Sequence, residues 1–104
     1  MGRFDDLGGD PRFLALLEDI AKLHSVKQAD YGVAGDPFAN VRASEQFGVP
    51  AWQGTMIRAN DKMQRIKAFI KNGGLKNESL EDSLQDLAVY ALIALILFRE
   101  GKQS

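Results

Sequence analysis

The feature that most constrains the fold is a 12-residue apolar run at positions 87–98, which directly follows an acidic segment. A helix needs about 20 apolar residues to cross a bilayer, so this run predicts a helix buried in protein. On a helical wheel its apolar residues fall on two faces rather than on one stripe. The predicted core face comprises Leu80, Leu84, Leu87, Ala91, Leu95 and Phe98, and the opposite face carries Val89, Ile93 and Ile96. We expect another helix or another copy of the chain to cover the opposite face.

Helical periodicity and end signals define the remaining elements. Asp10 and Pro11 predict the start of a helix over about 11–30, with Gly32 as its stop. Two further helices are expected, from about 50 or 55 to 71 and from about 77 or 79 to 100. We therefore predict an all-α bundle of three long helices plus a short helix, completed by oligomerisation. The whole chain, 1–104, forms a single domain in this prediction, with a flexible segment at 1–9 and a Gly- and Pro-containing connection at 32–54 that holds the short helix.

Charge and composition exclude several classes of function. The 13 basic residues nearly balance the 14 acidic ones, which disfavours binding to duplex nucleic acid or to an anionic membrane. The sequence contains no cysteine, so disulfides, thiolate nucleophiles and zinc fingers are excluded. The first ten residues lack the apolar centre of a signal peptide. We expect a cytoplasmic protein, in a host cytoplasm if a phage encodes it.

Three acids at four-residue spacing, Glu78, Asp82 and Asp86, lead into the buried part of the last helix. Carboxylates that converge at a partly desolvated wall raise one another's pKa unless a cation joins them. Magnesium is the cation that an all-oxygen cluster suits, and it commonly shares its coordination with phosphate oxygens. The alternative is that these acids only stabilise the helix start against the macrodipole, although Asp86 lies two turns in.

Basic residues could supply the countercharge for a polyphosphate. Arg58, Lys62 and Arg65 form a line along one margin of the helix that is predicted to end at about residue 71. Lys27 lies near the centre of the apolar stripe of the first helix, one turn from Asp30. These side chains are candidate phosphate ligands. Alternatively, Arg58, Lys62 and Arg65 form the solvated side of their helix. Lys27 would then extend from the edge of the core to water.

Other polar and aromatic residues give weaker signals. Tyr31, Asn40 and Trp52 are candidates for binding a base or ribose, but Trp52 fits better as a hydrophobic residue that closes the Gly-rich connection. The single histidine, His24, lies beside apolar residues and fits a packed core edge better than a catalytic base. No Gly-rich phosphate-binding loop is present, because the segment GVAGDP lacks the required lysine.

The segments KQADYG, FANV, DKMQRI and NESLEDSLQDLAVYALIAL together resemble a small phage and bacterial family that is labelled a nucleotide-modification-associated domain. The last segment also looks like the second metal-binding helix of the MazG-like, all-α nucleoside triphosphate pyrophosphohydrolases. The closer resemblance covers about residues 20–99. It implies an oligomeric helical bundle, a dimer or larger, whose partner is a nucleotide or nucleoside polyphosphate.

The resemblance to the pyrophosphohydrolases also implies roles for individual residues. Those enzymes hold magnesium with a Glu-x-x-Glu and a Glu-x-x-Asp motif on successive helices, and Asp86 matches the last acid of the second motif. This chain departs from the pattern at Ser83 and Lys27, where glutamates are expected. Asp82 and Glu78 would compensate as metal ligands, and Asp30 would bind metal or orient the attacking water.

Three hypotheses follow. The first is magnesium-dependent hydrolysis of the α–β phosphoanhydride of a nucleoside triphosphate, with Asp30 and Asp86 as catalytic residues. The second is a non-catalytic protein that sequesters a nucleotide or cyclic nucleotide, which the lysine at position 27 favours. The third is a purely structural oligomerisation module, in which the acids are the solvated end of an assembly seam.

Overall fold

The computed structural model describes residues 8–31, 38–73 and 80–103. Its elements are α2 (Pro11–Tyr31), α3 (Ala39–Arg42), the 3-10 helix η1 (Ala43–Phe47), α4 (Ala51–Asn72) and α5 (Leu80–Gln103). All described secondary structure is helical, which confirms the all-α class with three long helices. The short helix is present as α3 and η1, inside the predicted connection. Much of the predicted N-terminal segment lies outside the described residues.

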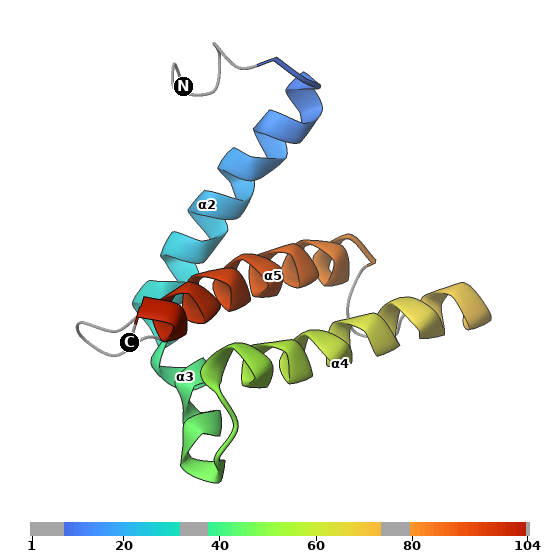
Figure 1. The fold of residues 1–104 in the computed structure, drawn as a ribbon. Coiled ribbons are helices and arrows are strands. Elements are labelled where there is room, and N and C mark those ends of the chain that lie inside the picture. Colours follow the sequence, from blue (N-terminus) through green and yellow to red (C-terminus); the bar gives the residue numbers. More distant parts are fainter. Residues whose placement is uncertain (1–7, 32–37, 74–79, 104) are drawn as a thin grey trace.

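The two longest helices, α4 and α5, lie side by side and run antiparallel, whereas α2 projects away from them (Figure 1). Two contacts define the antiparallel register: Trp52 meets Phe98 at one end, and Lys62 meets Asp86 further along. The molecule measures 41 × 37 × 25 Å. None of the described helices combines the length and the apolar character needed to cross a bilayer.

Local signals in the sequence explain where the helices begin and end. The Asp10 side chain accepts a hydrogen bond from the backbone N–H of Arg12 at 2.8 Å, which caps α2 ahead of Pro11. The side-chain and backbone hydrogen bonds from Arg12 hold the pKa of Asp10 below its ordinary value. Gly48 and Gly73 end η1 and α4 with φ of 79° and 76°, a left-handed conformation that glycine adopts without strain.

Small side chains form the contact between α4 and α5. The buried residues of this contact are Ala51, Thr55 and Ala59 on α4, and Ser83, Ala94 and Leu97 on α5. Those on α4 recur every four residues and therefore lie on one side of the helix. Because five of the six are small, the two helices can approach closely, but the contact buries little apolar surface.

The connection before α4 packs tightly on its first turn. A Cβ at Gly54 would collide with the side chain of Ser44, so only glycine fits there without a shift. Ser44 is itself held by a 3.0 Å hydrogen bond from its hydroxyl to the carbonyl of Val49. This contact fixes η1 against α4.

The predicted core face of α5 is wrong. Leu84, Leu95 and Phe98 are exposed, and the buried positions are Ser83, Ala94 and Leu97, about 60° around the helix. The physical reason is that α5 is apolar nearly all round, so hydrophobicity does not indicate which side meets α4. The small residues that allow close approach decide it.

Candidate functional site

A sheltered ion pair joins α4 and α5. The Nζ of Lys62 lies 3.0 Å from Oδ2 of Asp86, and the two side chains are only 18% and 16% exposed. Both residues were predicted as site residues from their spacing. Charges with so little solvent contact interact more strongly than surface pairs.

The other predicted charges on these helices lie on the same edge of the α4–α5 contact. Arg58 and Arg65 are one turn before and one turn after Lys62, and Asp82 is one turn before Asp86. Because the helices are antiparallel, Arg65 and Asp82 both lie toward the same end of the helix pair, one turn beyond Lys62 and Asp86. Arg58, Arg65 and Asp82 are exposed. We call this row of three basic and two acidic residues the charged edge.

Ser83 adds a polar group that sequence reasoning did not include in the site. It is fully buried, and its Oγ has no hydrogen-bond partner in the described structure. It lies three residues before Asp86, so the two side chains are neighbours on α5. A buried hydroxyl without a partner costs about 1–3 kcal/mol, and such groups often mark a place for a water or ligand. The signal in the sequence that could have identified Ser83 is its position three residues before Asp86.

Several predicted residues cannot be placed. Glu78 lies outside the described residues, and so do the side chains of Lys27, Asp30 and Tyr31 on α2 and of Asn40 on α3. The structure therefore leaves the first acidic motif and two of the three base-binding candidates as predictions.

Trp52 lies at the other end of the helix pair. It precedes Lys62 by ten residues, about 15 Å of helix rise. Its ring packs edge-on against Phe98, with centroids 5.6 Å apart and an interplanar angle of 84°. The described structure therefore does not bring Trp52 and the charged edge together.

The donors on the charged edge have the chemistry that magnesium prefers. Asp82 and Asp86 offer carboxylate oxygens on successive turns of α5. Within residues 8–31, 38–73 and 80–103, no group of three or more His, Asp or Glu side chains is placed to hold a metal. A third carboxylate would have to come from Glu78 or Asp30. Asp82 and Asp86 are therefore of the ligand type that magnesium prefers, and they are the two candidate ligands on the charged edge that the structure describes.

Two hollows lie elsewhere. One of about 440 Å³ is at the far end of the pair, where Arg42 binds Glu100 at 3.0 Å beside Trp52 and Phe98. The other, of about 210 Å³, lies between α2 and α5 and is lined almost entirely by apolar side chains. His24 lines this second hollow with its ring 6.0 Å from that of Phe38, in the packed setting expected for it. Neither hollow contains a described residue of the charged edge.

Comparison with known proteins returned no match, whether to a protein family, to a curated protein or to a solved structure.

Proposed function

We propose that this protein is a magnesium-dependent nucleotide-handling protein of the MazG-like type, and that it binds polyphosphate at the charged edge of α4 and α5. The observation that carries the proposal is the sheltered Lys62–Asp86 pair, in which an acid and a base from different helices meet at 3.0 Å. Arg58 and Arg65 extend the positive charge by one turn in each direction. Several cations along a line would match the successive negative charges of a polyphosphate.

In this proposal the basic residues bind the phosphates and the acids hold the metal. Lys62 and Arg65, with Lys27 from α2, neutralise charge that develops on the phosphate oxygens. Asp82, Asp86 and Glu78 would hold magnesium, which when bound polarises the phosphoryl group and lowers the pKa of a bound water. Asp30 would bind the metal as a further ligand or orient the attacking water.

The reaction is hydrolysis of the α–β phosphoanhydride. A new bond forms between the water oxygen and the α-phosphorus, and the bond from that phosphorus to the bridging oxygen breaks. Pyrophosphate leaves with the electron pair of the broken bond, and a nucleoside monophosphate remains. Tyr31 and Asn40 are the proposed base or ribose ligands, whereas contact with Trp52 requires a ligand that extends about 15 Å along α4.

A second candidate function is sequestration of a nucleotide or cyclic nucleotide without hydrolysis. It is favoured by the contact between Lys62 and Asp86, because an ammonium group already neutralises the central carboxylate. It is also favoured by Ser83, whose buried hydroxyl stands where a third carboxylate would complete the metal site. A lysine that leaves the carboxylate for a phosphate would bind the ligand and leave it intact.

One incubation distinguishes the candidates. The protein is mixed with magnesium and, separately, with each dNTP, each NTP and a set of cyclic nucleotides, and the mixtures are analysed by ion-exchange chromatography. Hydrolysis is expected to give a nucleoside monophosphate and pyrophosphate in equal amounts. Recovery of an intact nucleotide that co-elutes with the protein supports sequestration.

The third hypothesis, a purely structural oligomerisation module, predicts that none of these nucleotides is cleaved or bound. If no nucleotide is cleaved or retained, and if neither nucleotides nor magnesium change the melting temperature, both ligand-based proposals are wrong. A ligand that binds only the folded state must raise its stability. The melting curve therefore detects binding even where turnover is absent.

A further inference from the structure

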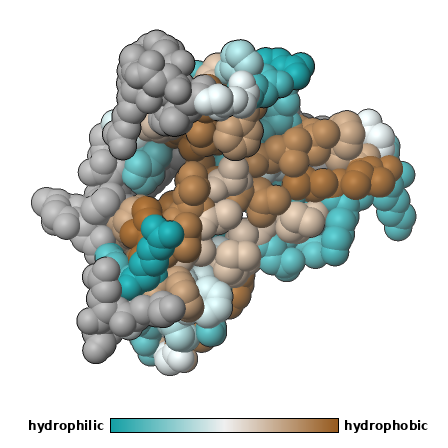
Figure 2. Space-filling model, turned by 45° about the horizontal axis from the view of Figure 1, so that its top comes forward, coloured by the Kyte–Doolittle hydropathy of each residue, from teal (hydrophilic) through white to brown (hydrophobic). Residues whose placement is uncertain are grey.

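The hollow at the far end of the α4–α5 pair combines aromatic rings with charged side chains, and we call it the aromatic hollow. It lies where η1 and the first turn of α4 meet the last two turns of α5. Its volume of about 440 Å³ is typical of small-molecule pockets, which span about 300–1,000 Å³. Hydrophobic side chains also cross the middle of one face of the molecule (Figure 2). A purely apolar surface does not indicate the chemistry of a ligand, whereas a hollow with both rings and charges does.

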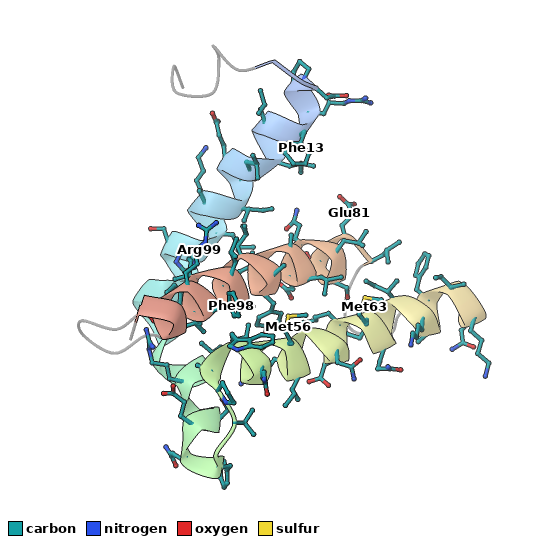
Figure 3. The ribbon with its side chains drawn as sticks, viewed as in Figure 1. Phe13, Met56, Met63, Glu81, Phe98 and Arg99 are labelled. Atoms are coloured by element: carbon teal, nitrogen blue, oxygen red, sulfur yellow. The ribbon has the colours of Figure 1, made fainter. Side chains whose placement is uncertain are left out.

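Two aromatic rings meet at one side of the aromatic hollow. The ring of Trp52 on α4 lies 5.6 Å from that of Phe98 on α5, and their planes are nearly perpendicular, at 84°. Phe98 lies in the strip between the two ribbons (Figure 3). The buried side chains of Ala51 and Leu97 line the hollow as well. The face of an aromatic ring carries partial negative charge and attracts cations, so these two rings favour a positively charged ligand.

The charged side chains of the aromatic hollow leave one negative charge uncompensated. The guanidinium of Arg42 donates hydrogen bonds to both carboxylate oxygens of Glu100, at 3.2 and 3.0 Å. The charges of this pair cancel. Glu45 also lines the hollow, and in the described part of the chain it forms no ion pair. The described lining therefore carries a net negative charge, which attracts a cation and repels an anion.

The helix dipoles do not change this preference. The aromatic hollow meets the first turn of α4, which is the positive end of that helix, and the last turns of α5, which are the negative end. These two contributions oppose each other, so the side chains decide the sign of the ligand. An anion would have to take Arg42 from Glu100 and lie beside Glu45.

The supply of hydrogen-bond acceptors indicates the kind of cation. A primary ammonium has three N–H donors and a guanidinium has five, and each donor needs an acceptor when it leaves water. The two rings offer no strong acceptor, and Glu100 already accepts hydrogen bonds from Arg42. A fully methylated ammonium has no N–H group, and its methyl groups pack against rings while its charge is attracted to their faces. The lining therefore suits a trimethylammonium group best.

We infer that the aromatic hollow binds a small molecule with a trimethylammonium group, of the choline type. The cationic head lies against Trp52 and Phe98, and Glu45 supplies the countercharge. This site is separate from the charged edge, because Trp52 precedes Lys62 by ten residues, about 15 Å of helix rise. It requires neither magnesium nor a nucleotide, so its failure and that of the proposed function are distinguishable.

Trp52 reports binding directly, because it is the only tryptophan in the sequence. Its fluorescence is followed while choline is added at constant ionic strength, without magnesium or nucleotides. A saturable change is expected, with an affinity about tenfold higher than for dimethylbutanol, the neutral analogue in which carbon replaces the charged nitrogen. Equal affinities for the two compounds overturn the inference, and so does the absence of a saturable change up to about 0.1 M choline.

Glu45→Gln removes the countercharge and keeps the size of the side chain. It should raise the dissociation constant for choline at least about threefold, the effect expected for one exposed ionic contact. The matched control is Glu81→Gln, which removes an exposed carboxylate at the other end of α5 and should leave the affinity unchanged. Equal weakening by both substitutions would trace the effect to the overall charge of the protein and overturn the inference.

Trp52→Leu removes the larger ring but keeps an apolar side chain, and it should weaken choline binding about tenfold, as measured by calorimetry. Circular dichroism establishes that the variant is folded. An unchanged affinity in folded Trp52→Leu overturns the inference. If this variant does not fold, Glu45→Gln still decides, because Glu45 is exposed and its substitution leaves the helix contacts intact.

Two further additions identify the source of the ligand and exclude another occupant. Phosphatidylcholine vesicles carry the same head group on a lipid. Sedimentation of the protein with these vesicles would assign the group to a lipid, whereas choline binding without it would assign the group to a free solute. Adenosine offers an uncharged base that can stack on Trp52. If adenosine binds and choline does not, the inference is wrong and Trp52 is a base ligand.

Discussion

Asp86→Asn should abolish the magnesium-stimulated hydrolysis of nucleoside triphosphates, with a loss of at least about 100-fold in turnover. Asparagine keeps the size of aspartate but removes the charge that would hold the metal. Product formation is followed by ion-exchange chromatography, and helical content is followed by circular dichroism. If the protein only sequesters its ligand, the same substitution changes the affinity and no turnover is seen in either protein.

The substitution also leaves Lys62 without its charged partner. Removing one member of a fully buried ion pair costs about 3–5 kcal/mol, and the 18% exposure of Lys62 places the expected cost below that range. The variant should therefore remain folded. Glu81→Gln is the matched control, since Glu81 is an exposed carboxylate on the same helix whose side chain points away from α4 (Figure 3). Unchanged turnover in Asp86→Asn, with Glu81→Gln also active, would remove Asp86 from the mechanism.

Leu97→Ala should lower the free energy of unfolding by about 2–5 kcal/mol, the usual range for a buried leucine. Leu97 is 5% exposed and is the largest buried apolar side chain described in the contact between α4 and α5. The other buried apolar residues described are alanines, which are too small to fill the cavity that the substitution leaves. Urea unfolding measures the change, with all proteins compared at one concentration.

The control for this variant is Ile57→Ala, which removes a similar volume from an exposed site on α4. It should change the stability by less than about 0.5 kcal/mol. Similar losses in both variants would show that the α4–α5 contact is not the main source of stability.

The helix ends could be predicted from the sequence because they depend on neighbouring residues. Asp10 caps α2 through a hydrogen bond two residues away, and Gly48 and Gly73 end their helices by their own backbone conformation. The packing of α5 could not be predicted in this way. Which side of an all-round apolar helix meets α4 depends on the shape of both helices, and the fully buried Ser83 falls between the two faces that hydrophobicity favoured.

The candidate site, too, could be predicted from the sequence only in part. The spacing of Asp82 and Asp86 within α5 follows from the sequence, because residues four apart lie on adjacent turns. That Lys62 meets Asp86 depends on the register between two helices, which no local pattern encodes. The pair between Arg42 and Glu100 is another example, since 58 residues separate its members and neither was singled out.

The most direct test of the polyphosphate site is a crystal of the protein soaked with magnesium and a non-hydrolysable nucleoside triphosphate. The proposed function predicts phosphate oxygens within about 3 Å of the Nζ of Lys62, and a magnesium ion bound by Asp82 and Asp86. A triphosphate bound elsewhere, with Lys62 and Asp86 still paired with each other, would contradict it.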